Sequence, residues 1–141
     1  MVQKTIANIS DAQGSPLAVA IEVSGHHIFG DEPVAQGGNN LGPAPYDLLT
    51  AALAECTAMT VRWYARREGW PIEHVHVTVA HNKTAQAGST EMIDAFRKTV
   101  SITAPELSEE QRGKLIEIAG KCPVHKTLAG GAIRIQTEAA R

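Results

Sequence analysis

The chain has 141 residues, a formal net charge of −2, 43% hydrophobic residues and two cysteines. This length corresponds to one ordinary domain, and the apolar content supports a packed core, which argues against intrinsic disorder. The weakly negative charge gives no general attraction to nucleic acid or anionic membranes, and two cysteines cannot form the disulfide framework of a small secreted protein.

The sequence also predicts a cytoplasmic location. Its first residues contain no apolar stretch of the kind that forms a signal peptide. The longest mostly apolar segment, residues 44–61, contains Asp47 and Glu55, which makes it a poor candidate for a membrane span. We therefore expect neither membranes nor nucleic acid among the partners of this protein.

The N-terminal third has the pattern of three antiparallel strands. Residues 2–9 form a short β-rich run, and a turn-forming segment separates them from alternating apolar residues at 17–23. Ser24 and Gly25 then predict a tight hairpin turn into a third strand at residues 26–29.

A long helix is expected next. The Gly-, Asn- and Pro-rich loop at residues 36–45 lacks the Gly-Lys-Ser/Thr ending of a phosphate-binding loop and instead leads into a helix. That helix covers residues 46–68 and is ended by Gly69. Because residues 48–61 are apolar almost all round, we expect it to be central and buried on most sides.

The C-terminal half predicts two more strands, two shorter helices and a final strand. Alternating valines at residues 75–79 predict one strand, and apolar residues of even number between 92 and 102 predict the next. A Ser-x-x-Gln capping box and a Cys-Pro pair each start a helix, and residues 133–137 form the last strand. With the two adjacent short helices counted as one helical segment, the order βββ-α-ββ-α-β is an α+β pattern, so we expect one α+β domain over residues 1–141.

Cys56 lies in the middle of the predicted long helix. It shares a helix face with Leu49, Leu53 and Trp63, which are spaced from it by three or seven residues. A free cysteine on an apolar helix is usually a small buried hydrophobic residue. Taken alone, this position therefore favours a structural role over a chemical one.

Cys122 has a different setting. Pro123 follows it, and because proline prefers the first position of a helix, Cys122 is expected to be the N-cap. Backbone N–H groups and the helix dipole then point at the sulfur and favour the thiolate. Leu115 and Ile118 indicate that the preceding helix directs Cys122 inward, which makes the two cysteines a candidate redox pair.

A structural zinc site is an alternative use of these residues. Cys122 and His125 have the Cys-x-x-His spacing of half a zinc site. Cys56 and a distant histidine would have to complete the site through tertiary contacts, because the cysteines form no second closely spaced pair. The sequence therefore predicts no bound metal.

Three segments of the chain carry a resemblance. They are Gly-Pro-Ala-Pro-Tyr-Asp-Leu-Leu at residues 42–49, Ala-Ala-Leu-Ala-Glu-Cys-Thr-Ala-Met-Thr at 51–60 and Cys-Pro-Val-His-Lys-Thr-Leu at 122–128. Together they resemble the family of osmotically inducible protein C (OsmC) and organic hydroperoxide resistance (Ohr) proteins. The resemblance covers nearly the whole chain and implies the OsmC-like fold, an intertwined homodimer whose β-sheets wrap around two long central helices.

The resemblance also implies thiol peroxidase chemistry in oxidative stress defence. Cys56 would attack an organic or inorganic hydroperoxide as a thiolate and become a sulfenic acid, and Cys122 would then form a disulfide with it. An external dithiol, a small thiol or a lipoylated protein would reduce this disulfide, and no bound cofactor is implied. Leu49 and Leu53 would line an apolar pocket for the substrate.

Two positions depart from the pattern of this family. Family peroxidases carry a glutamate near the start of the helix, which holds an arginine from the N-terminal strands over the thiolate. Here Tyr46 takes the position of the glutamate, and the nearest acid is Asp47. No arginine occurs in the N-terminal third of the chain, so His26, His27 or Arg97 would have to replace it.

The missing arginine motivates an alternative function, a non-catalytic protein that binds a small apolar or thiol-reactive molecule in a pocket at the dimer interface. For either function, the pocket would contain Asp47, Leu49, Leu53 and His26. The two functions differ in a measurable way, because only a peroxidase loses its two thiols to a hydroperoxide.

Overall fold

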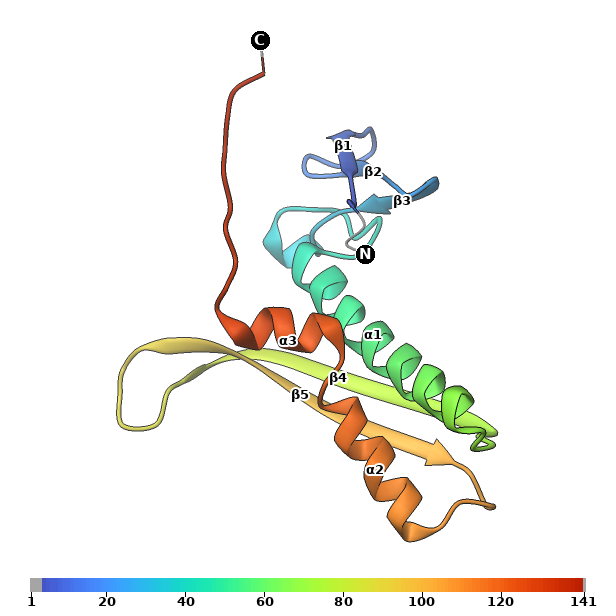
Figure 1. Cartoon of the computed structure of the whole chain (residues 1–141). Coiled ribbons are helices and arrows are strands. Elements are labelled where there is room, and N and C mark those ends of the chain that lie inside the picture. The colour runs from blue at the N-terminus through green and yellow to red at the C-terminus, as the bar shows by residue number, and fades with distance from the viewer. Residues whose placement is uncertain (1–3, 141) are drawn as a thin grey trace. The chain divides into compact units, whose positions relative to one another are not determined.

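The N-terminal sheet follows from alternating side chains and a tight turn. The computed structural model of this chain describes residues 4–140, whose contacts form two units, the first ending at Leu49 and the second beginning at Thr50. In the first unit, three strands form an antiparallel sheet in the order β1-β2-β3: β1 (Ala7–Asp11), β2 (Val19–Val23) and β3 (His26–Gly30) (Figure 1). The prediction of three antiparallel strands is confirmed.

The turn between β2 and β3 has the expected residues and geometry. Ser24 and Gly25 both have positive φ angles, 50° and 79°, as a two-residue type I′ hairpin turn requires. The first strand lies later than predicted, because β1 begins at Ala7. Of the strand expected at residues 2–9, residues 2 and 3 lie outside the described part of the chain.

A buried carboxylate organises the loop after β3, which includes the short 3₁₀ helix η1 (Val34–Gln36). Asp31 accepts hydrogen bonds from the Ser15 hydroxyl at 3.0 Å and from the backbone N–H groups of Glu32 at 2.8 Å, Asn39 at 3.0 Å and Leu41 at 3.2 Å. Burial raises the pKa of Asp31, but these four donors outweigh it and hold the pKa below its usual value.

The long helix α1 (Pro45–Glu68) matches the predicted range to within one residue. At its start, the Asp47 carboxylate accepts a hydrogen bond from the N–H of Ala44 at 2.9 Å, which satisfies one of the donors that a helix N-terminus leaves free. At its end, Gly69 adopts the left-handed conformation with φ of 72°, a common helix stop that glycine reaches without steric cost.

α1 packs through one face. Its buried residues recur every four positions and are Leu53, Thr57, Val61 and Ala65. Met59 and Trp63, which lie between them in sequence, are 61% and 59% exposed. The prediction of a helix buried on most sides is therefore wrong for the single chain, because α2 and the β4–β5 hairpin cover only one face of it.

The second unit contains the β4–β5 hairpin. Strands β4 (His74–Ala85) and β5 (Met92–Thr103) pair antiparallel along their full length, with His74 opposite Thr103 and Ala85 opposite Met92. Burial alternates along both strands, so that one face of the hairpin points inward and the other toward solvent. Both strands were expected from this alternation and are confirmed.

Two short helices complete the second unit. α2 (Glu109–Ala119) begins with the predicted capping box, in which Ser108 and Gln111 each bond the backbone N–H of the other. α3 (Pro123–Gly130) follows it directly. The core lies where α1, α2 and the inner face of the hairpin meet (Figure 1), and its buried members are Val61, Ala65, Ala104, Leu107, Leu115 and Ala119.

The predicted last strand at residues 133–137 does not form. Residues 131–140 continue from α3 as an extended segment without regular structure (Figure 1), and Ile135 within them is 85% exposed. A strand needs a neighbouring strand for its hydrogen bonds, and within the described residues this segment has none.

The α+β class is confirmed, whereas the single domain over residues 1–141 stays a prediction. Among the described residues, no helix is long and apolar enough to cross a membrane.

Candidate functional site

Cys122 is the N-cap of α3, as its Cys-Pro sequence predicts. Its sulfur accepts a hydrogen bond from the backbone N–H of His125 at 3.4 Å, and Pro123 occupies the first helical turn. The side chain is fully buried. An N–H donor and the positive end of the helix both favour a negatively charged sulfur at this position.

Cys56 reaches the same helix terminus from α1. Its sulfur accepts a hydrogen bond from the backbone N–H of Val124 at 3.5 Å. Two successive N–H groups in the first turn of α3 are thus directed at the two cysteines, one at each sulfur. The two thiols are free, and each of them shifts the pKa of the other. Cys56 is half-buried, so it is the more accessible of the two.

Thr57 and Lys98 extend this pair into a polar cluster. The Thr57 hydroxyl lies 3.6 Å from the Cys122 sulfur and donates a hydrogen bond to the carbonyl of Leu53 at 2.8 Å. The Lys98 ammonium donates to the Thr57 hydroxyl oxygen at 3.1 Å and to the Ala119 carbonyl at 2.6 Å. We call Cys56, Thr57, Lys98 and Cys122 the cysteine cluster.

The environments of the two thiols drive their pKa values apart. Burial on its own raises the pKa of Cys122, but hydrogen bonds from His125, Thr57 and Cys56, together with the positive charge of Lys98, lower it below its usual value. Burial raises the pKa of Cys56, and the neighbouring Cys122 raises it further. The structure therefore favours the charge state in which Cys122 is the thiolate and Cys56 is the thiol.

His125 contributes no positive charge to this cluster. Its burial and then the nearby Lys98 ammonium lower the pKa of the imidazole. Its Nδ1 atom is buried and has no hydrogen-bond partner among the described residues. Within residues 4–140, no three His, Cys, Asp or Glu side chains come together as a metal site, so the alternative zinc site lacks its remaining ligands.

The other predicted site residues lie on α1 and in the first unit. Leu53 is a buried core residue one turn before Thr57. Asp47 caps the start of α1, Leu49 is 36% exposed and His26 is an exposed residue of β3, and all three belong to the first unit. The assignment of these residues to a substrate pocket stays a prediction.

The cation that approaches the cysteines is Lys98. Arg97, one of the expected replacements for the family arginine, lies on the exposed face of β5, because neighbouring residues of a strand point to opposite faces. Lys98 shares its parity with Phe96, Val100 and Ile102, the apolar residues from which the strand was predicted. Lys98 could have been identified from the sequence, because it is a lysine at an inward-facing position of an otherwise apolar strand.

Thr57 is the second functional candidate that the sequence interpretation missed. It is the polar member of an otherwise apolar row of residues four apart on α1, with Leu53 before it and Val61 after it. A buried hydroxyl requires a hydrogen-bond partner. A threonine in an apolar row of a helix therefore indicates that a polar group packs against it.

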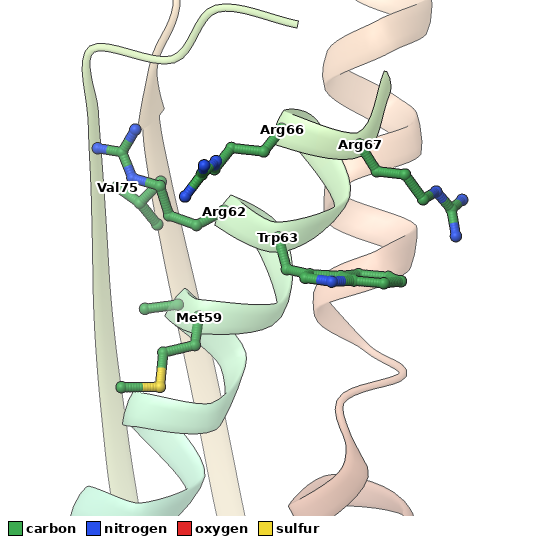
Figure 2. Close-up of a pocket in the computed structure, with 7 residues that line it drawn as sticks. Met59, Arg62, Trp63, Arg66, Arg67 and Val75 are labelled. Carbon is green, nitrogen blue, oxygen red and sulfur yellow. The ribbon is translucent and has the colours of Figure 1, made fainter. Parts of the chain in front are cut away.

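An open pocket of about 770 Å³ lies elsewhere on α1, toward its C-terminal end. Figure 2 shows Met59, Arg62 and Arg66 on the side of the helix toward Val75 of β4, whereas Trp63 and Arg67 extend toward the other side. The guanidinium of Arg67 lies 5.0 Å from the ring centre of Trp63, within the range of a cation–π interaction. Neither cysteine lines this pocket.

A comparison with protein-family models identifies the family of this chain. A family model described as OsmC-like protein matches residues 37–138. A sequence search of curated proteins found no match. Among solved structures, an OsmC-like protein from Mycoplasma pneumoniae is 21% identical, with a TM-score of 0.72 and coverage of 94% of this chain and 92% of that one.

Two organic hydroperoxide resistance proteins have similar folds. The protein from Legionella pneumophila is 20% identical, with a TM-score of 0.68 and 92% of each chain covered. The protein from Elizabethkingia anophelis is 16% identical, with a TM-score of 0.68 and coverage of 93% of this chain and 91% of that one. At these identities, the likeness establishes a common fold, so the OsmC-like fold expected for the single chain is confirmed, whereas the intertwined homodimer stays a prediction.

Proposed function

Because the chain belongs to the family of OsmC-like proteins, we propose that it is a thiol-dependent peroxidase that reduces organic hydroperoxides in oxidative stress defence. The observation that carries the proposal is that two successive backbone N–H groups at the N-terminus of α3, those of Val124 and His125, donate to the sulfurs of Cys56 and Cys122. Both sulfurs therefore lie at one helix terminus, which supports the formation of a disulfide between them. The names of the Legionella and Elizabethkingia relatives support the choice of substrate.

The accessibility of the two cysteines supports the roles that we propose for them. Hydroperoxide reaches half-buried Cys56 before fully buried Cys122. The Cys56 sulfur attacks one peroxide oxygen, the O–O bond breaks, an alcohol leaves and a sulfenic acid forms. Cys122 then attacks the Cys56 sulfur, water leaves and a disulfide forms, which an external dithiol or a lipoylated protein reduces by exchange.

The test is a thiol titration of the reduced protein. One equivalent of cumene hydroperoxide is expected to remove both thiols of each chain and to leave an intramolecular disulfide, visible by peptide mass spectrometry. A protein treated with cumyl alcohol, which has no O–O bond, is the control. Unchanged thiol counts after hydroperoxide treatment would refute the peroxidase.

We also propose that the protein is a cytoplasmic homodimer. Large apolar side chains of the single chain are exposed on α1, at Met59 and Trp63, and in the extended C-terminal segment, at Ile133 and Ile135. Monomeric proteins rarely expose contiguous apolar surface, so a second copy is the expected cover. Light scattering of the purified protein is expected to give twice the mass of the chain, and a monomer would contradict the homodimer.

A non-catalytic binding protein is the second candidate function. The pocket beside Trp63 and Arg67 favours it, because an aromatic ring and a guanidinium are common recognition groups for small molecules. The thiol titration separates the two functions, since a binding protein keeps its thiols in the presence of hydroperoxide.

A further inference from the structure

Lys98 brings a positive charge to the cysteine pair from the middle of β5. It is half-buried on the inward-facing side of the strand, between the half-buried apolar residues Phe96 and Val100. Its ammonium is held by the Ala119 carbonyl at 2.6 Å and the Thr57 hydroxyl oxygen at 3.1 Å. Both acceptors are neutral, so neither supplies the negative charge that a partly desolvated ammonium favours. A Cys122 thiolate would supply it.

Thr57 connects this charge to Cys122. A hydroxyl has one hydrogen to donate and two lone pairs that accept. Because the Lys98 ammonium donates to the Thr57 oxygen, the hydroxyl hydrogen points away from Lys98, toward either the Leu53 carbonyl or the Cys122 sulfur at 3.6 Å. A negative charge on that sulfur attracts the hydrogen, and the ammonium polarises the hydroxyl in the same direction.

The groups that surround Cys122 come from four different elements and favour the thiolate form of this cysteine. α1 contributes the Cys56 thiol and the Thr57 hydroxyl, β5 contributes the Lys98 ammonium, and α3 contributes the N–H of His125 beside its own neutral imidazole. α2 contributes the Ala119 carbonyl, which keeps Lys98 in place. Each of these groups donates to the Cys122 sulfur or supports a donor.

We propose that Lys98, acting through Thr57, holds the negative charge of the reduced pair on Cys122, so that Cys122 is the base that activates Cys56. Lys98 is thus a positioning residue. Its positive charge stabilises a thiolate at Cys122, whereas the missing arginine would stabilise one at Cys56. This inference rests on the proposed peroxidase function and adds the origin of its nucleophile.

With Cys122 as the base, the protons and electrons of the reaction balance. The Cys56 proton moves to the Cys122 thiolate as the Cys56 sulfur attacks the peroxide, and the departing alkoxide takes that proton and leaves as alcohol. Cys122, again a thiolate, displaces hydroxide from the Cys56 sulfenic acid, and one proton from solvent converts hydroxide to water. One O–O bond is broken, one S–S bond is formed, and the two electrons lost by the sulfurs are gained by the peroxide.

The test measures the ionisation of Cys122 in the reduced protein without peroxide. In a Cys56→Ser background, where serine still donates a hydrogen bond, the ultraviolet absorbance of the thiolate is followed against pH. Lys98→Met and Thr57→Val are each expected to lower the ionisation constant of Cys122 by about tenfold or more, because the first removes a nearby positive charge and the second removes a hydroxyl beside the thiolate. Lys98→Arg keeps the charge and is expected to restore most of the ionisation.

Lys114→Met is the matched control, since Lys114 is a lysine of the same unit that forms a surface ion pair with Glu117 at 3.5 Å. It is expected to leave the titration unchanged. An unchanged titration in Lys98→Met would overturn the proposal. If that variant does not fold, Thr57→Val decides by the same measurement, because valine keeps the shape of threonine and removes only the hydroxyl.

The failure of this inference is distinguishable from the failure of the proposed function. If the thiol titration with hydroperoxide succeeds but Lys98→Met leaves Cys122 ionisation unchanged, the peroxidase stands and the role of Lys98 is refuted. If peroxide leaves the thiols intact, the peroxidase is refuted whatever the ionisation of Cys122.

Discussion

The hydroxyl of Thr57 lies 3.6 Å from the sulfur of Cys122, residues that are 65 positions apart in the chain. This contact joins the middle of α1 to the N-terminus of α3 and places a polar group in a row of buried apolar residues. It also brings the N-capping sulfur within the influence of Lys98, which donates to the same hydroxyl. The chemistry of the site therefore depends on the packing of α1, α3 and β5 against one another.

The two cysteine variants are expected to fail at different steps. Cys56→Ser should abolish hydroperoxide consumption, because the accessible sulfur is gone. Cys122→Ser should slow the attack and stop the reaction at a Cys56 sulfenic acid, which dimedone labelling followed by mass spectrometry detects. Full turnover in both variants would show that neither sulfur carries the reaction.

The rate of hydroperoxide reduction is expected to depend on the ionisation of Cys122. The pKa of Cys122 is lowered, so its thiolate form dominates from a lower pH than that of an ordinary cysteine. The second-order rate constant, measured by stopped-flow under reducing conditions, should rise with pH and level off at a lower pH than an ordinary cysteine would give. A midpoint at or above the ordinary cysteine pKa would contradict this charge assignment.

Asp31→Asn is expected to destabilise the N-terminal unit in a pH-dependent way. The folded-state pKa of Asp31 is lowered, so its contribution to stability is present above the unfolded value of about 3.9 and is lost as pH falls through the folded pKa. Thermal unfolding should show a lower Tm for the variant near neutral pH and a smaller difference in acid. Asp11→Asn, which changes an exposed carboxylate in β1, is the control.

The core of the second unit depends on Leu115. This side chain of α2 is fully buried in the cluster with Val61 and Ala104. Leu115→Ala is expected to lower the free energy of unfolding by about 2–5 kcal/mol, because it removes buried methyl groups and leaves a cavity. Ile116→Ala next to it, at a side chain 51% exposed, should cost far less in the same urea titration. Equal losses at the two positions would contradict this core.

Local features of the fold were predictable where neighbouring residues determine them. The Ser24–Gly25 turn, the Ser108 capping box and the Cys122 N-cap each depend on residues within a few positions of one another, and each was predicted correctly. The strand at residues 133–137 was wrong because a strand requires a partner, which side-chain alternation does not provide.

By itself, the sequence determined the types of the main elements as far as α3, the position of Cys122 at a helix N-terminus and the family to which the chain belongs. Only the tertiary structure decided that Cys56 and Cys122 reach the same helix terminus and that Lys98 reaches Cys122 through Thr57. The physical reason is the separation along the chain over which each interaction acts. Capping and alternation act between residues close in the chain, whereas a hydrogen bond or a charge in a low-dielectric interior acts between side chains that only the packing of α1, β5 and α3 brings within a few ångströms.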